Sequence, residues 1–200
     1  MNRQELVIVN RIKEQLFEGD YTCVIAKDDN TFTSKARGVK PLLDLLDAGT
    51  DLRDAIAADK VIGKAAAFLY VLLGVSFVYA GVISKPALGV FEKYGIECEF
   101  DTLVDAIENR TKTGFCPMET TVWNIEEPEG VPELLKETLR RLAEEAKYRE
   151  AIKSMPICKI EDARAEIAEA QAVTEGELDL DQLRRQMEAL DAEKKRRGYK

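Results

Sequence analysis

The run AAAFLYVLLGVSFVYAGVI, from Ala65 to Ile83, decides the fold because it contains no charged residue. Its length would allow it to span a bilayer as a single helix. Gly74, however, divides it into a half rich in Ala and Leu and a half rich in Val, Phe and Tyr. These compositions are typical of a buried helix, a turn and a buried strand. We therefore expect an α/β protein with no membrane partner.

Helical and extended patterns alternate on both sides of this run. Helices are expected at residues 5–17, 40–49, 59–74, 84–95 and 101–110, and strands at residues 21–26, 31–36, 52–58, 75–84 and 96–100. A polar turn separates the first two strands, which indicates a hairpin. The later strands and helices follow one another at short spacing, which predicts a mixed or largely parallel sheet covered on both faces. The expected fold class is a three-layer α/β/α sandwich.

The composition excludes several kinds of chemistry. Histidine is absent from the sequence, which removes Ser-His-Asp and Cys-His catalysis and HExxH zinc sites. The four cysteines, Cys23, Cys98, Cys116 and Cys158, include no C-x-x-C pair, so we expect no metal and no cofactor. With 29 basic and 37 acidic residues, the net charge of −8 gives no electrostatic basis for binding nucleic acid.

The N-terminal residues MNRQELVIVNRIKEQ alternate charged and apolar side chains. They lack the uninterrupted apolar core and the small-residue cleavage site of a signal peptide. Together with the widely spaced cysteines, this pattern predicts a cytoplasmic protein with reduced thiols.

The sequence changes character after residue 130. Acidic and basic residues nearly balance between residues 131 and 200, where apolar residues recur at helical spacing. Pro156 interrupts this pattern before two further helical segments. We expect a domain at 1–142 and a helical C-terminal arm at 143–200, which docks on the body or forms a homo-oligomer contact with a second copy. The KKRR motif near the C-terminus is expected to be a solvated tail.

Three motifs carry a resemblance to a known family. The stretches IGKAAA, GVISKPAL and FCPMET occur in this order, beginning at Ile62, Gly81 and Phe115. Over residues 5–142 the chain resembles a prokaryotic family of unassigned function whose fold is similar to that of cytidine deaminases. The resemblance implies a deaminase-like fold for the α/β domain.

The same resemblance separates this chain from zinc-dependent deaminases. In those enzymes a His-x-Glu or Cys-x-Glu motif opens one core helix and Pro-Cys-x-x-Cys opens the next, and together they hold a zinc ion that activates water. Here GKAAA, at 63–67, and SKPALG, at 84–89, stand at those places. Neither supplies a zinc ligand, so the resemblance implies the fold and its pocket without zinc-dependent hydrolysis.

Lys64 and Asp59 are the first two candidate catalytic residues. Lys64 lies in the first turn of an apolar helix, where the positive end of the helix dipole disfavours an ammonium group. It is therefore either a nucleophilic or Schiff-base amine, or a surface cation whose stem reaches solvent. Asp59 precedes the same helix and is expected to cap it or to pair with Lys64.

Cys116 is the third candidate catalytic residue. With Pro117 at the first helical position and Glu119 two residues later, it forms a helix start of the capping-box type. Unpaired backbone N–H groups at this place would favour a reactive thiolate, whereas the charge of Glu119 would oppose it. The alternative is a structural helix start whose thiol is inert.

Ser84 and Lys85 begin the following core helix. They could offer backbone N–H groups and a cation to an anion, or Ser84 could be a simple N-cap. We predict a metal-independent pocket for a small anionic or nucleotide-like molecule. Its candidate lining residues are Asp59, Lys64, Ser84, Lys85, Cys116 and Glu119.

Whether this pocket is catalytic stays open at the level of sequence. In an enzyme, Lys64 would be the amine nucleophile or an electrostatic anchor, and Cys116 or Glu119 would assist proton transfer. The alternative is a non-catalytic protein that senses a ligand or assembles through its arm. The loss of every zinc ligand favours the alternative, whereas the charged residues at the pocket positions favour the enzyme.

Overall fold

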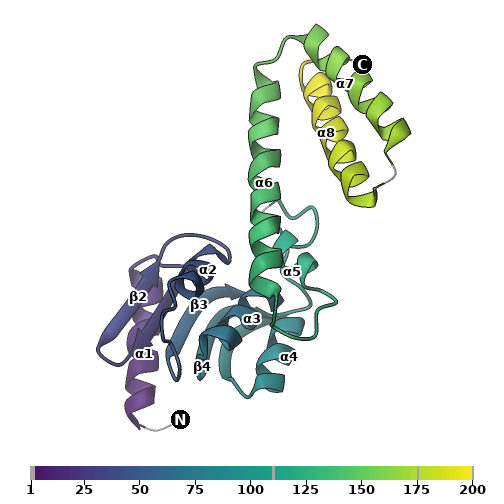
Figure 1. Cartoon of the computed structure of the whole chain (residues 1–200). Helices are drawn as coiled ribbons and strands as arrows, with labels where there is room; N and C mark the ends of the chain where they lie inside the picture. The colour runs from purple at the N-terminus through teal and green to yellow at the C-terminus, as the bar shows by residue number, and fades with distance from the viewer. Residues whose placement is uncertain (1–2, 110, 175, 200) are drawn as a thin grey trace. The chain divides into compact units, whose positions relative to one another are not determined.

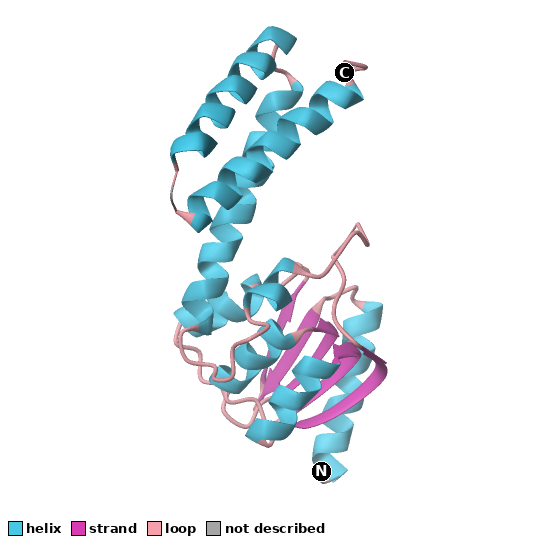
Figure 2. Cartoon of the chain, turned by 90° about the vertical axis from the view of Figure 1, so that its right-hand side faces the viewer, coloured by secondary structure: helices cyan, strands magenta, loops and turns pink. Residues whose placement is uncertain are grey.

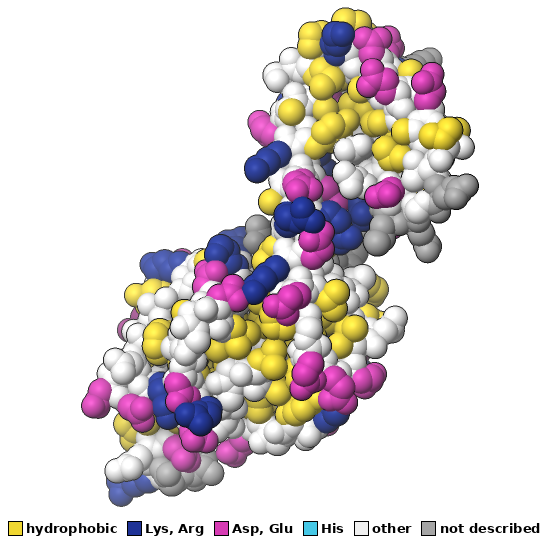
Figure 3. All heavy atoms as spheres, viewed as in Figure 1, with side chains coloured by type: hydrophobic (Ala, Val, Ile, Leu, Met, Phe, Trp, Pro, Cys, Tyr) yellow, Lys and Arg dark blue, Asp and Glu magenta, His cyan; other side chains and the backbone are white. Residues whose placement is uncertain are grey.

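The computed structural model describes residues 3–109, 111–174 and 176–199. The chain divides into two units, the first ending at Thr138 and the second beginning at Leu139. Each unit is described by itself. On the face shown in Figure 3, acidic and basic side chains are interspersed over both units.

One five-stranded sheet organises the first unit, in the order β2-β1-β3-β4-β5. The strands are β1 (Cys23–Lys27), β2 (Asn30–Ser34), β3 (Ile56–Ile62), β4 (Phe77–Ser84) and β5 (Glu97–Val104). β1 pairs antiparallel with both β2 and β3, and β3, β4 and β5 run parallel. The sheet is therefore mixed, as predicted.

Helices cover both faces of this sheet (Figures 1 and 2). They are α1 (Arg3–Glu18), α2 (Lys40–Asp47), α3 (Lys64–Leu73) and α4 (Lys85–Tyr94). α1 buries Val9, Ile12 and Leu16 against side chains of β1, β3 and β4. On the opposite face, Tyr70 of α3 reaches Cys23 of β1. Because alternate residues of a strand point to opposite faces, both faces of the sheet are covered by apolar packing.

The uncharged run forms the elements that its composition predicts. α3 is followed by Gly74, whose φ of 75° ends the helix in the left-handed conformation, and then by β4. Phe68, Leu69 and Val78 have no exposed surface. Both halves of the run therefore belong to the core. In the part of the chain that the structure describes, no helix is both long enough and apolar enough to cross a membrane.

One predicted helix boundary is wrong, and one predicted helix is replaced by a strand. Residues 59–62 belong to β3, and α3 begins only at Lys64. The helix predicted from Asp101 is replaced by the continuation of β5 to Val104, and the last residue predicted for it, Arg110, lies outside the described residues. The reason is tertiary pairing, because Thr102, Leu103 and Val104 extend the parallel ladder on β4. Such pairing overrides the local preference of a short segment.

In the described part of the chain, four helices follow the sheet. The short helix α5 (Pro117–Thr121) belongs to the first unit, and α6 (Val131–Lys153) begins there and ends in the second. α7 (Ile157–Val173) and α8 (Glu177–Arg196) complete the second unit. Its core contains Ile152, Ile160, Ile167 and Leu190.

The prediction of a solvated KKRR tail is wrong for Lys194 and Arg197, whereas Lys195 and Arg196 are exposed. The Arg197 guanidinium donates hydrogen bonds of 2.6–2.8 Å to the carbonyl oxygens of Ile152, Lys153 and Met155. Lys194 pairs with Glu161 at 3.2 Å. The guanidinium of Arg197 thus donates to carbonyl groups at and just beyond the carboxyl end of α6.

Candidate functional site

Two core helices begin at the same edge of the sheet. β3 ends at Ile62 and α3 begins after Gly63, while β4 ends at Ser84 and α4 begins directly after it. Because β3 and β4 are parallel neighbours, their carboxyl ends bring the two helix N-termini together. The Ser84 hydroxyl accepts a hydrogen bond from the N–H of Ala87 at 3.3 Å. Ser84 is therefore the N-cap of α4, as one of the two interpretations of the sequence predicted.

The carboxylate of Glu119, from α5, lies at this edge and accepts three hydrogen bonds. Its Oε1 accepts from the Lys64 N–H at 3.2 Å and from the Ser84 hydroxyl. Its Oε2 accepts from the Ile107 N–H at 2.5 Å. We call these three donors the Glu119 cradle. Glu119 is 1% exposed and Ser84 is 0% exposed, so the cradle holds a buried carboxylate.

The surroundings explain why a buried carboxylate is tolerated here. The N-terminus of α3 presents a partial positive charge and an N–H group that no helical carbonyl satisfies. Hydrogen bonds to an ionised acceptor are also stronger than neutral ones. A side chain at Gly63 would crowd this place, because a Cβ there would lie 3.1 Å from Ile107 Cγ1 and 3.4 Å from the Glu119 carboxyl group.

Lys64 is buried rather than extended into solvent. Its Nζ donates to the carbonyl oxygen of Trp123 at 2.7 Å and lies 5.7 Å from the centre of the Phe68 ring. The residue is only 9% exposed. The surface-cation interpretation of Lys64 is therefore wrong. Its role as a nucleophile stays a prediction.

Asp59 belongs to a different polar network. It accepts hydrogen bonds from the Val61 N–H at 3.0 Å and from the Tyr70 hydroxyl at 2.9 Å. The Tyr70 oxygen lies 3.2 Å from Cys23 Sγ. The predictions that Asp59 caps α3 or pairs with Lys64 are wrong. Asp59 lies inside β3, the N-cap of α3 is Gly63, and the Lys64 ammonium group is bonded to Trp123.

Burial dominates the protonation of this second network. It raises the pKa of Asp59 to about 6, against the opposing effect of the hydrogen bonds from Val61 and Tyr70. Burial and the nearby Asp59 charge also raise the pKa of the Cys23 thiol and of the Tyr70 hydroxyl. A low-dielectric environment disfavours the charged form of each acid. Cys23 and Tyr70 are therefore neutral hydrogen-bonding groups.

Cys116 and Lys85 lie near the cradle in sequence but contribute none of its three donors. Cys116 is the N-cap of α5, and its N–H donates to the carbonyl oxygen of Ile107 at 2.7 Å. The predicted capping box is wrong, because the Glu119 carboxylate reaches α3 and α4 instead of Cys116. The Lys85 side chain is 64% exposed and pairs with Asp105 at 2.6 Å. The ligand-binding role of Lys85 stays a prediction.

Two participants in the site were missed by sequence reasoning. Ile107 contributes a backbone N–H group, for which its side-chain type gives no signal. Trp123 contributes the carbonyl group that holds Lys64, and its ring, 44% exposed, stacks on Phe115 with centroids 6.1 Å apart. A tryptophan among acidic and polar neighbours could have drawn attention, since it is the sole tryptophan in the sequence.

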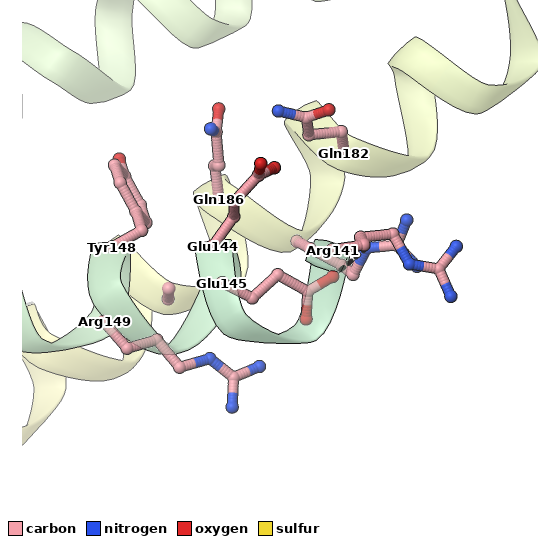
Figure 4. A pocket seen from close by; sticks show the side chains of 9 residues that line it. Arg141, Glu144, Glu145, Tyr148, Arg149, Gln182 and Gln186 are labelled. Atoms are coloured by element: carbon pink, nitrogen blue, oxygen red, sulfur yellow. Dashed lines mark ion pairs between the residues drawn. The ribbon is translucent and has the colours of Figure 1, made fainter. Parts of the chain in front are cut away.

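The second unit contains a small cavity of about 50 Å³ between α6 and α8 (Figure 4). Arg185 pairs with Glu145 across it at 3.0 Å. Among the described residues, the buried Arg141 Nε has no hydrogen-bond partner. The lining residues are Arg141, Glu144, Glu145, Tyr148, Arg149, Gln182, Arg185, Gln186 and Ala189. A cavity of this size has room for little more than water.

In the described part of the chain, no group of three or more Cys, Asp and Glu residues is arranged to hold a metal ion. The cradle is made of hydrogen-bond donors, which suit an anion rather than a cation.

The first unit thus defines an α/β protein with a mixed sheet, helices on both faces and a buried carboxylate at the carboxyl ends of β3 and β4. The chain belongs to the family described as TM1506, Domain of unknown function (DUF1893), whose model matches residues 11–139. It is similar to the crystal structure of a DUF1893 family protein (TM1506) from Thermotoga maritima. That similarity has a TM-score of 0.61 and 26% identity, and covers 68% of this chain and 91% of that chain. No curated protein matches the present chain.

Proposed function

We propose that this chain is a non-catalytic binding protein, with a cytidine-deaminase-like fold that lacks zinc, and that it recognises a small anionic molecule at the Glu119 cradle. The observation that carries this proposal is the convergence of three donors, from Lys64, Ser84 and Ile107, on one buried carboxylate. Such a group of donors is complementary to a carboxylate or another small oxyanion.

The position of the cradle in the fold supports the same proposal. In open α/β sheets, ligands bind beyond the carboxyl ends of the strands. The stretches 63–67 and 84–89 begin α3 and α4 at this edge, and the resemblance to deaminases implies that these are the places of the zinc motifs. In this proposal the deaminase-like pocket is retained, and hydrogen-bond donors replace the metal ligands.

The partners of the predicted catalytic groups favour binding over catalysis. The Lys64 ammonium group is held by Trp123, and Asp59 is bonded to Tyr70 and Val61. Proton transfer requires an acid or base within hydrogen-bonding reach of the reacting atom. Asp59 is therefore poorly placed to serve Lys64.

The test is to remove the Glu119 carboxylate and then measure whether free anions bind at the cradle. Glu119→Ala removes the carboxylate, and titration calorimetry with acetate, formate and phosphate then measures binding to the full chain. We expect acetate and formate to bind this variant with a dissociation constant of about millimolar, as single-group ligands do. The matched control is Glu108→Ala, which removes an exposed carboxylate that accepts none of the cradle hydrogen bonds.

Two further outcomes decide the proposal. Ser84→Ala in the Glu119→Ala background removes one donor and should weaken acetate binding about tenfold. If the folded Glu119→Ala variant binds none of the three anions, the cradle is a structural device and the proposal is refuted.

A second candidate function is amine catalysis by Lys64. The observation that favours it is the burial of Lys64, a residue type that forms Schiff bases with carbonyl compounds, in the first turn of α3. Borohydride trapping with mixtures of carbonyl metabolites, followed by intact-mass measurement, tests it. A reduced adduct on Lys64 that is missing in the Lys64→Arg control would support an enzyme. If wild type shows no more adduct than Lys64→Arg, Schiff-base chemistry at Lys64 is rejected.

A further inference from the structure

We propose that Glu119 is an autoinhibitory contact. In this inference, residues 115–123, which we call the strap, close the cradle with their own carboxylate and must move away when an external anion enters. The inference rests on the proposed function, because it assumes that the cradle has an external ligand. It adds that the closed state is the resting state and that the ligand competes with a segment of the same chain.

The polar contacts of the strap are concentrated at the cradle. Glu119 receives its hydrogen bonds from three separate segments, at Lys64, Ser84 and Ile107. The Lys64 ammonium group adds a bond to the carbonyl group of Trp123, at the end of the strap. Lys64 therefore holds the strap twice, through its main chain and through its side chain.

The strap buries only part of its apolar surface. Met118 and Val122 are buried, at 7% and 0% exposure, whereas Phe115 and Trp123 are 62% and 44% exposed. The two exposed rings stack on each other, with an interplanar angle of 23°. Much of the aromatic surface of the strap thus stays in solvent and contributes little to its closure.

Simultaneous binding of Glu119 and an external anion is excluded by the geometry. The same three donors would have to serve both groups, and each of them already donates to Glu119. Because Glu119 is tethered, its effective concentration is high, and a free monoanion competes poorly with it. A ligand that opens the strap needs further contacts, which favours a molecule larger than acetate.

Hydrogen exchange of the full chain, followed by NMR, measures strap opening residue by residue. The relevant amides are those of Thr120 and Val122 in the strap, and those of Lys64 and Ile107 in the cradle. In Glu119→Gln and Glu119→Ala we expect exchange at all four to rise about tenfold or more, since a charge-assisted hydrogen-bond set is lost. Glu108→Gln and Glu108→Ala should leave these rates unchanged.

Adding acetate to Glu119→Ala separates the two proposals. We expect acetate to slow exchange again at Lys64 and Ile107 while Thr120 and Val122 stay fast, because the free anion fills the cradle without tethering the strap. Rapid strap exchange with no effect of acetate would show that Glu119 holds the strap closed, but it would refute anion binding and the autoinhibitory role with it. Strap exchange equal to wild type in both Glu119 variants would overturn this inference, whatever acetate does.

One further variant covers the case in which loss of Glu119 prevents folding. Ser84→Ala keeps the carboxylate and removes one of its three donors, so it should fold and raise strap exchange about threefold. Acrylamide quenching of Trp123, the sole tryptophan, gives an independent measure, and we expect the quenching constant to rise with strap opening. Unchanged exchange and quenching in folded Ser84→Ala would overturn the inference.

Discussion

Replacing Asp59 by Asn should make the first unit more stable above pH 6. Burial raises the pKa of Asp59 to about 6, whereas an aspartate in an unfolded chain has a pKa of about 4. The folded state therefore binds this proton more tightly than the unfolded state between these two values. Across that interval the free energy of unfolding falls as the pH rises, and above pH 6 the full cost of the buried charge is present.

The magnitude follows from the difference of about two pKa units. At about 1.4 kcal/mol per unit, the ionised Asp59 costs the folded state at most about 3 kcal/mol, and residual solvent contact reduces this value. Asn keeps the local hydrogen bonds, because its carbonyl group accepts from Val61 and its NH₂ group donates to the Tyr70 hydroxyl. That hydroxyl is then free to donate to Cys23.

Urea unfolding from pH 4 to pH 8, followed by Trp123 fluorescence, is the assay. Trp123 is the sole tryptophan and lies in the first unit, so the signal does not mix the transitions of the two units. At pH 8 we expect the free energy of unfolding of Asp59→Asn to exceed that of wild type by up to about 3 kcal/mol. This difference should disappear near pH 4. The exposed Asp29 supplies the control, because Asp29→Asn should follow wild type at every pH.

Comparing variants is necessary because other groups titrate in the opposite direction. Ion-paired carboxylates such as Asp20 and Asp105 have lowered pKa values, so their contribution is lost as the pH falls. These contributions are the same in wild type and variant, so they cancel in the difference between the two free energies of unfolding. Parallel curves for wild type and Asp59→Asn, or a less stable variant at pH 8, would show that Asp59 carries no unfavourable buried charge and would refute the reasoning.

Two further predictions concern the thiols and the second unit. A thiol reagent should label the exposed Cys158 first and leave Cys23 unmodified until the protein unfolds, as measured by mass spectrometry. The reason is that Cys23 is 6% exposed and the pKa of its thiol is raised. Labelling of Cys23 in the folded protein would contradict its burial. Arg197→Ala should destabilise the second unit by about 1–3 kcal/mol, measured as faster hydrogen exchange at the end of α6, because the carbonyl groups there lose a charged donor. The matched control is Arg184→Ala, which removes an exposed arginine paired at 3.3 Å with Asp181 and should have little effect on stability. If the two substitutions destabilise the unit equally, Arg197 does not cap α6.

Local patterns in the sequence predicted the central part of the fold. The uncharged run around Gly74 became α3 and β4 because its two halves differ in the backbone conformation that their side chains favour. Ser84 was predicted as an N-cap from its position alone, and the structure confirms that role. The alternation of strands and helices likewise indicated a mixed sheet with helices on both faces.

Predictions that depended on distant partners were the ones that changed. The segment after Asp101 looked helical, but pairing with β4 extends β5 through it. Asp59 looked like a helix cap, but β3 continues to Ile62 and Asp59 reaches Tyr70 instead. In both places a hydrogen-bonded ladder between strands outweighs the local preference of a few residues.

Glu119 shows most clearly what the sequence determined and what only the tertiary structure decided. The sequence by itself determined a helix start at Cys116 and Pro117 with a carboxylate two positions later. It also excluded histidine chemistry, since a missing residue type is visible without a structure. Only the tertiary structure decided where that carboxylate goes. Its donors Lys64 and Ser84 lie 55 and 35 residues away, and a buried charge is stabilised by whichever donors the fold brings to it.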